Sequence, residues 1–310
     1  MRGKFIMIAQ LGKSLLPAIL LVFFAASTLL GSSSNAGAQE ESITIGLLPE
    51  MNVFKQKQRF EPLAAYLSER MGIAVKLTIL SRYGNIIDRI KEEDVDGAFL
   101  GSFTGALAIS QLGVVPLARP VNNDGTSTYF GYIFARKNSN IKETADMKGK
   151  TLVLVERATT AGYVFPLAWF KLQGVKDINT YFSDHFFAGS HDAAIDAVLN
   201  NKADIGAAKN TIYERMRGLH PRVAKKLVIL ASSPRVPSNG LCVRNNLPEK
   251  HKEQLKNLLL NLHQDEKGVN VLLKFGAKHF VATSKEDYQP VINLAAEAGI
   301  DLKKYEYYNP

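Results

Sequence analysis

The sequence predicts an α/β protein of two lobes, each built around a sheet that is covered by helices. The first observation is that short apolar segments of strand length alternate with amphipathic segments of helical spacing from about residue 43 onwards. The second is that this alternation occurs twice, with an extended segment on each side of the second occurrence. The chain has 310 residues, enough for two lobes of ordinary domain size with a cleft between them.

The first occurrence runs from residue 43 to about residue 118. Phe60, Leu63 and Leu67 recur at helical spacing, and Gly72 follows where a helix commonly stops. The same pattern predicts strands at residues 43–47, 75–80, 96–101 and 114–118, and helices at 60–71, 83–92 and 103–112. This order predicts a largely parallel sheet with helices on both faces.

The second occurrence begins at residue 150. It predicts strands at residues 150–155, 181–187, 203–208 and 226–231, and helices at 159–173, 191–200 and 212–216. Extended segments at 127–136 and 239–244 bracket this unit, as two strands crossing between lobes would. Helices near 248–263, 269–275 and 288–298 are expected to pack back on the first lobe. The first lobe therefore combines residues 39–130 with 240–310, and the second is 131–239.

The N-terminal segment, residues 1–38, is typical of a secretory signal peptide. Three basic residues near the start precede an apolar run over residues 15–30, and Ala36-Gly37-Ala38 offers the small-x-small pattern of a cleavage site. An uncleaved membrane anchor is the alternative, although the run is short for a span of about 20 residues. No cysteine for lipid attachment lies near the cleavage site, so we expect an exported, freely diffusing protein.

Charge favours a small anionic ligand over nucleic acid. The chain has 38 Lys and Arg against 29 Asp and Glu, a formal charge of +9 that falls to +6 without the three basic residues of the signal segment. No run of five like charges occurs, which is weak ground for nucleic-acid binding. The single cysteine, Cys242, excludes an intramolecular disulfide.

Motifs for catalysis, metals and cofactors are missing from the sequence. It contains no Gly-x-Ser-x-Gly elbow, no phosphate-binding loop of the Walker type, no Gly-x-Gly-x-x-Gly and no cysteine cluster. We therefore expect no cofactor, no metal and no catalytic residues.

The turns that follow strands are where a ligand site is expected, because ligands of open α/β sheets bind beyond the carboxyl ends of the strands. Thr159 and Thr160 lie between a buried strand and a helix, where hydroxyls and backbone N–H groups can cradle an oxyanion. The alternative is that one of them merely caps the helix. His191 opens the helix after the next strand and can donate to an anion; alternatively Ser190 caps this helix and His191 lies on the surface.

Three further residues are candidates at neighbouring positions. Ser102 follows a strand and opens a helix, and Tyr83 opens another helix, where it can form an aromatic wall or belong to the core. Asn239 faces the cleft if the second extended segment crosses between the lobes.

The ordered set of these residues resembles the substrate-binding proteins of phosphate, phosphite and phosphonate ABC transporters. The resemblance covers most of residues 43–300 and is carried by FEPLAAYL (60–67), YGNII (83–87), VDGAFLG (95–101), Tyr132, TTAG (159–162), GSHD (189–192) and ADIGA (203–207). It implies the type II periplasmic-binding-protein (Venus-flytrap) fold, with two mixed sheets flanked by helices and lobes that close on the ligand. It also implies that Thr159, Thr160 and Ala161 form the anion loop, and that His191 and Tyr83 bind the same anion.

The chain departs from the family pattern at positions that decide the ligand. Ala161 replaces a third loop hydroxyl, and Leu100 stands where phosphonate binders can carry a second tyrosine. The acidic residues that hold a ligand amine are replaced, with Asn210 or Thr211 near one position and Asn239 near the other. A site without those carboxylates disfavours an aminoalkylphosphonate, since its ammonium group would be buried unpaired.

These observations together predict a monomeric periplasmic solute-binding protein, not an enzyme. It is expected to bind a small oxyanion of the phosphonate, phosphite or phosphate class and to deliver it to the permease of an ABC transporter in the inner membrane. One alternative is the same fold acting as the sensor input of a membrane histidine kinase, and another is an exported hydrolase or transferase.

Overall fold

The computed structural model describes residues 41–49, 53–80 and 85–307, and residues 42–310 form one compact unit. The expected signal peptide, residues 1–38, and Tyr83 lie outside the described residues. None of the helices within the described ranges has the length and apolar character needed to cross a bilayer.

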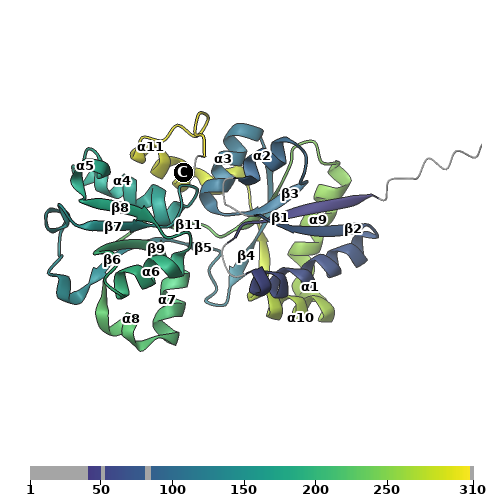
Figure 1. The fold of residues 1–310 in the computed structure, drawn as a ribbon. Coiled ribbons are helices and arrows are strands. Elements are labelled where there is room, and N and C mark those ends of the chain that lie inside the picture. The colour runs from purple at the N-terminus through teal and green to yellow at the C-terminus, as the bar shows by residue number, and fades with distance from the viewer. Residues whose placement is uncertain (1–40, 50–52, 81–84, 308–310) are drawn as a thin grey trace, which may run out of the picture. The chain divides into compact units, whose positions relative to one another are not determined.

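The first sheet has six strands and draws them from both ends of the chain (Figure 1). Its spatial order is β13 (Ala277–Ala282), β4 (Val115–Asn122), β12 (Gly240–Val243), β3 (Gly97–Leu100), β1 (Ser42–Leu47) and β2 (Ala74–Ile79). β1 is parallel to β2 and β3, whereas β12 is antiparallel to β3 and β4, and β13 is antiparallel to β4. The expected parallel run therefore stops at β3, and the sheet is mixed.

Helices cover both faces of this first sheet. One face carries α1 (Val53–Met71), α9 (Glu249–Asn261) and α10 (Glu266–Phe275), whose apolar residues pack with Ile43 and Ile45 of β1. The other face carries α2 (Asn85–Lys91) and α3 (Ser102–Leu112) (Figure 1). Phe60 of α1 packs edge-on against Phe99 and Phe275, with ring centroids 5.1 and 5.0 Å away.

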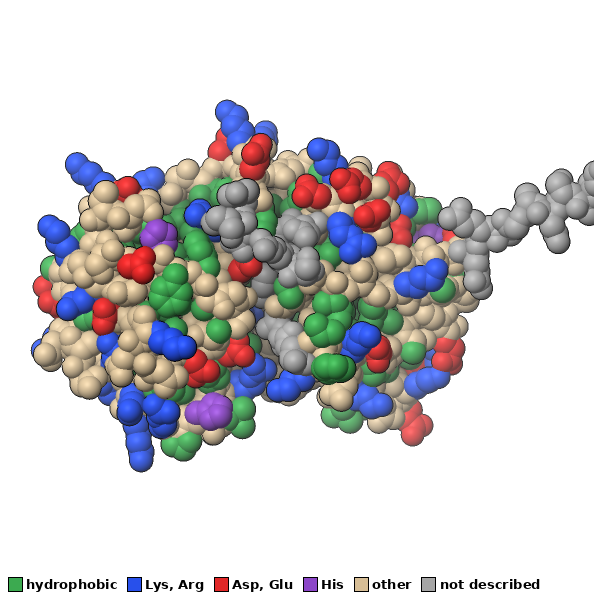
Figure 2. Space-filling view, in the orientation of Figure 1, with side chains coloured by type: hydrophobic (Ala, Val, Ile, Leu, Met, Phe, Trp, Pro, Cys, Tyr) green, Lys and Arg blue, Asp and Glu red, His purple; other side chains and the backbone are tan. Residues whose placement is uncertain are grey.

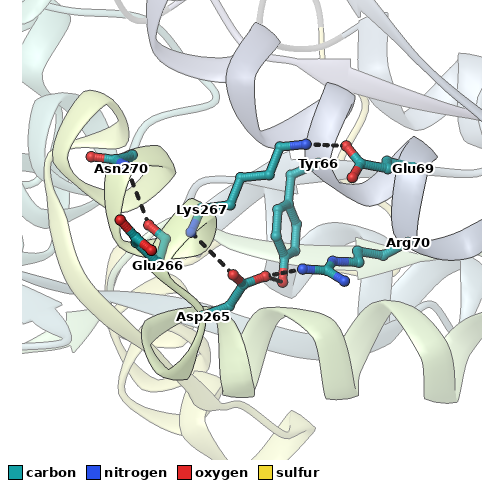
Figure 3. Close-up of polar contacts among 7 residues, drawn as sticks. All are labelled: Tyr66, Glu69, Arg70, Asp265, Glu266, Lys267 and Asn270. Atoms are coloured by element: carbon teal, nitrogen blue, oxygen red, sulfur yellow. Dashed lines mark hydrogen bonds and ion pairs between the residues drawn. The ribbon is translucent and has the colours of Figure 1, made fainter.

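Polar contacts also join α1 to α10 (Figure 3). Asp265 precedes α10 and accepts hydrogen bonds from Tyr66 Oη at 2.8 Å and from the Lys267 N–H at 3.0 Å. Its carboxylate also pairs with Arg70, and Lys267 pairs with Glu69. These contacts hold the start of α10 beside α1.

The second sheet has five strands from the middle of the chain. Its order is β10 (Leu227–Ser232), β6 (Gly131–Arg136), β9 (Ile205–Lys209), β7 (Thr151–Leu154) and β8 (Asp184–Phe187). β7 is parallel to β8 and β9, and β6 is antiparallel to β9 and β10. The π-helix η3 (Thr160–Val164) and α4 (Phe165–Leu172) pack on one face, and α6 (His191–Leu199), α7 (Asn210–Leu219) and α8 (Pro221–Lys226) on the other (Figure 1).

Two short strands lie where the chain passes between the sheets. β5 (Thr128–Tyr129) and β11 (Val236–Pro237) pair antiparallel, with Tyr129 opposite Val236 and Thr128 opposite Pro237. The extended segments predicted on either side of the second unit are therefore neighbours in space.

Several predicted elements differ from the structure. α1 begins at Val53, not residue 60, and the expected strand at 181–187 is preceded by the short helix α5 (Ile178–Tyr181), so that β8 begins at Asp184. α8 and β13 were not predicted. The final helix α11 (Gln289–Ala298) was expected to pack on the first lobe only, but it contacts α4 as well as α3. Its buried face, Val291, Leu294 and Ala295, lies in a core shared by both sets of helices.

Candidate functional site

Six of the seven predicted site residues line one small cavity. These are Ser102, Thr159, Thr160, Ala161, His191 and Asn239, joined by Tyr129 and Lys209. They come from elements of both large sheets and from the segment after β11. The cavity volume is about 20 Å³, which is room for about one water molecule.

The loop after β7 brings three of these residues together. Thr159 is the N-cap of the π-helix in extended conformation (φ −112°, ψ 135°), but its side chain makes no capping hydrogen bond. Its Oγ1 donates instead to the carbonyl of Glu156 at 2.6 Å. Thr160 and Ala161 follow in the first turn and are buried. The interpretation of Thr159 as a side-chain cap is therefore wrong. The N–H groups of the first helical turn have no partner within the helix, and they lie at the same helix end as the threonine hydroxyls.

Close packing leaves no room for a side chain behind this loop. A Cβ on Gly162 would lie 2.8 Å from Thr159 Oγ1 and 2.5 Å from Val155 Cγ2. A Cβ on Gly131 of β6 would lie 3.0 Å from the Cα of Ala161. The two glycines allow the loop to sit directly against the sheet, which fixes the position of Thr160.

A chain of buried hydroxyls connects the two sides of the cavity. Ser102 Oγ lies 2.6 Å from Thr160 Oγ1 and 2.5 Å from Tyr129 Oη. Ser102 is fully buried, and Thr160 and Tyr129 are 2% and 4% exposed. The hydrogen bond between Ser102 and Thr160 joins α3, which follows the first sheet's β3, to the loop of the second sheet.

His191 is buried at the start of α6. Ser190 is the N-cap of this helix and accepts a hydrogen bond from the Ala193 N–H at 3.3 Å, as the capping interpretation expected. His191 is nevertheless not on the surface, since it is only 7% exposed. Its Nδ1 accepts from the backbone N–H of Lys209 at 3.2 Å, so the neutral ring carries its proton on Nε2.

Lys209 and Tyr129 line the same cavity, and the sequence analysis did not single them out. The Lys209 Nζ lies 4.2 Å from the ring centroid of Tyr129 and donates to Asn239 Oδ1 at 3.2 Å. Lys209 ends β9 directly before α7, so it occupies the same kind of strand-to-helix turn as Ser102, Thr159 and His191. That position was the available signal for Lys209, whereas nothing local marks Tyr129.

A second cavity, of about 400 Å³, shares His191, Lys209 and Asn239 with the first. Its remaining lining includes Arg59 and Arg215, and the rings of Phe60, Phe99 and Phe275 form apolar walls. Among the described residues, neither cavity is lined by an aspartate or a glutamate. The larger volume lies in the range of ordinary ligand pockets.

The cavity residues are suited to hold an anion. Hydroxyl, imidazole, ammonium and helix N-terminal N–H groups are donors. Over the described ranges no group of three or more His, Cys, Asp or Glu side chains is placed to hold a metal ion.

The molecule has two sheets covered by helices, paired extended segments that join them, and a donor-lined cavity built from both. This combination defines a two-lobed solute-binding protein of the type II class. Comparison with known proteins agrees with this class. The family of periplasmic substrate-binding proteins of phosphonate ABC transporters matches residues 45–288. The chain therefore belongs to this family.

Individual relatives are distant in sequence. The phosphonates-binding periplasmic protein of Escherichia coli (strain K12) is 23% identical over 276 residues, covering 88% of this chain and 81% of the relative. The phosphate-import protein PhnD of Mycolicibacterium smegmatis is 29% identical over 192 residues, covering 59% of this chain and 60% of the relative.

Solved structures share the fold. PhnD1 from Prochlorococcus marinus, in complex with methylphosphonate, is 20% identical and covers 84% of this chain and 99% of its own, with a TM-score of 0.73. A binding-protein component of a phosphonate ABC transporter from Pseudomonas aeruginosa is 23% identical and covers 84% of this chain and 87% of its own, with a TM-score of 0.74.

Proposed function

We propose that this protein binds a small phosphorus oxyanion of the phosphonate, phosphite or phosphate class in the smaller cavity and delivers it to an ABC transporter. The observation that carries the proposal is that six predicted residues from both sheets meet around one buried cavity whose described lining has donors and no carboxylate. The names of the family and of its relatives support the choice of a phosphorus ligand.

Each lining residue has a role in this proposal. The Thr160 hydroxyl and the Ala161 N–H hold the anion from the second lobe, and His191 donates from Nε2. Thr159 lines the cavity and holds the loop in place, because its own N–H and hydroxyl donate to the Glu156 carbonyl. Ser102 donates from the first lobe. Lys209 supplies positive charge at the junction, in place of the acidic residues that a ligand ammonium would need.

The ligand must separate hydroxyls that are in contact. A tetrahedral oxyanion has five heavy atoms and does not fit a cavity of about 20 Å³. Binding therefore replaces the hydrogen bond between Ser102 and Thr160 with hydrogen bonds from both residues to the anion. Because these residues belong to different sheets, the same exchange couples the ligand to the opening and closing of the lobes.

We further propose how the protein is organised and where it acts. The first lobe comprises residues 39–130 and 240–310 and the second 131–239, with paired β5 and β11 as the hinge and α11 packed against α4 of the second lobe. Export removes residues 1–38, and the mature protein is a periplasmic monomer without catalytic activity. The face in Figure 2 carries both acidic and basic side chains, and we propose that the protein does not bind nucleic acid.

Titration calorimetry of the mature protein with phosphate, phosphite and methylphosphonate tests the ligand class. We expect saturable binding of at least one, with sulfate and a small carboxylate as control anions. Absence of binding by all three phosphorus anions refutes the proposal, and so does consumption of the ligand, which indicates an enzyme. N-terminal sequencing of the exported protein tests cleavage, for which residue 39 is the expected start.

A further inference from the structure

We propose that the segment after α11, residues 299–307, is a strap that holds the two lobes together beside the smaller cavity and so controls how fast a ligand leaves. The strap is fastened to the first sheet through α3, and to the loop after β7 through the hydroxyls of Tyr305 and Tyr307. It is inferred from contacts within the chain and does not depend on which ligand binds.

The attachment to α3 uses backbone carbonyls and one aromatic ring of the strap. Gln111 of α3 donates from Nε2 to the Leu302 carbonyl at 2.8 Å and to the Tyr305 carbonyl at 2.9 Å. The ring of Tyr305 packs edge-on against Phe103, with the ring centroids 5.3 Å apart. Phe103 directly follows Ser102 at the start of α3, so this end of the strap lies next to a residue of the smaller cavity.

The attachment to the loop after β7 is made by two phenolic hydroxyls. Tyr305 Oη donates to the carbonyl of Arg157 at 2.9 Å. Tyr307 Oη donates to the carboxylate of Glu156, the preceding residue. Thr160, whose hydroxyl meets Ser102 in the smaller cavity, lies three residues after Arg157 in the same loop. Tyr305 alone therefore contacts α3 on one side and this loop on the other.

Apolar packing holds the strap at the junction of the two sheets. α11 and the segment after it, yellow in Figure 1, lie between α4 and α3, and α11 contacts both helices. Val291, Leu294 and Ala295 of α11 and Leu302 of the strap are buried in one core with residues of α3 and α4. The strap is therefore a second connection between the sheets, separate from the paired strands β5 and β11.

The position of Tyr305 links it to the movement that a ligand requires. The hydroxyl oxygens of Ser102 and Thr160 lie 2.6 Å apart and, under the proposed function, separate whenever a ligand enters or leaves the smaller cavity. Tyr305 contacts the residue next to Ser102 and the loop that carries Thr160, so this separation acts on its own contacts. A hydrogen bond that breaks as the lobes open raises the barrier to opening, and its removal should let a bound ligand leave faster.

Stopped-flow measurement of ligand dissociation from Tyr305→Phe tests the strap, with whichever of phosphate, phosphite and methylphosphonate binds most tightly. The substitution removes the hydroxyl and keeps the ring that packs against Phe103. Loss of one hydrogen bond of ordinary strength should raise the dissociation rate constant by about two- to tenfold. Tyr307→Phe should act in the same direction, and the double variant should exceed either single one.

Tyr181→Phe is the matched control, because it removes the same kind of hydrogen bond from within one lobe. Tyr181 Oη donates to the Thr144 carbonyl at 2.7 Å, and both residues belong to the chain segment that forms the second sheet. Tyr181 and Tyr305 are both partly buried. The control should lose similar stability in chemical denaturation and keep the wild-type dissociation rate. A rate that Tyr305→Phe raises no more than Tyr181→Phe overturns the strap.

A measurement without ligand tests the strap independently of the proposed function. Spin labels at Leu219→Cys on α7 and Leu273→Cys on α10, which are 69% and 74% exposed, report the separation of helices that cover different sheets. The native Cys242 is fully buried and stays unlabelled. Pulsed electron resonance on the double variant Tyr305→Phe, Tyr307→Phe should show a population at a new label distance. An unchanged distance distribution overturns the strap and leaves the proposed function standing, whereas absence of phosphorus-anion binding overturns the proposed function and not the strap.

Discussion

Replacing Thr160 with valine separates the contribution of the Thr160 hydroxyl to ligand binding from its contribution to the stability of the fold. The substitution exchanges a hydroxyl for a methyl of nearly the same shape at a residue that is 2% exposed. It removes the hydrogen bond to Ser102, but Ser102 keeps Tyr129 Oη at 2.5 Å, so no buried hydroxyl is left without a partner. The expected loss in the free energy of unfolding is therefore only about 1 kcal/mol.

The expected loss of affinity follows from the same contacts. A hydrogen bond to a charged group contributes about 1.5–3 kcal/mol. The wild-type protein must first give up the hydrogen bond between Ser102 and Thr160, worth about 1 kcal/mol, which Thr160→Val no longer has. The net loss of binding free energy is then about 0.5–2 kcal/mol, or about two- to thirtyfold in Kd.

The assay is calorimetric titration of wild type and variant with whichever phosphorus anion binds most tightly, alongside chemical denaturation. Thr104→Val is the matched control, because Thr104 is 1% exposed, lines neither cavity and donates to the Gly101 carbonyl at 3.1 Å. That carbonyl keeps the Gly105 N–H at 2.7 Å, so the control should lose similar stability and no affinity. Equal affinities for Thr160→Val and wild type would refute the contact between this hydroxyl and the ligand.

Three further outcomes are expected. Gly162→Ala forces its new Cβ against Val155 and should cost about 1–3 kcal/mol of stability by denaturation while weakening anion binding in calorimetry. The hydrogen bond from Tyr66 is the main cause that lowers the pKa of Asp265. The stability that the ionised Asp265 contributes is therefore present at neutral pH and is lost as the pH falls through this lowered pKa. Asp265→Asn should lower Tm at pH 7, and the difference in Tm between variant and wild type should narrow below about pH 3.8 in a series of melting curves. Burial raises the pKa of the Cys242 thiol to about 12, so thiol reagents should modify the unfolded protein and not the native one.

The meeting of these residues at one cavity could be predicted because it follows a rule that is local in sequence. Ser102, Thr159, His191 and Lys209 each stand where a strand gives way to a helix, and parallel strands bring their carboxyl ends to the same edge of a sheet. Three of the four were recognised from this position. Lys209 was missed although it occupies the same place at the end of β9.

The rest depends on contacts between residues far apart in the sequence. Tyr129 reaches Ser102 because β5 pairs with β11, more than a hundred residues later. Arg59 and Arg215 lie on helices whose charged residues would ordinarily face solvent, and only the packing of the helices places them around a cavity. β13 is an edge strand with an exposed Lys278, paired to β4, and its local pattern gave no period-two signal.

The hydrogen bond between Ser102 and Thr160 limits how a ligand can act on the lobes. These hydroxyls already satisfy each other at 2.6 Å, so contact between elements of the two sheets does not require a ligand. A ligand shifts an equilibrium only through interactions that it makes better in one form than in the other. A neutral ligand would exchange one hydrogen bond for others of similar free energy, whereas each hydrogen bond donated to an anion is stronger than a neutral one. Under the proposed function, negative charge, more than the number of hydroxyls, is therefore what this cavity selects.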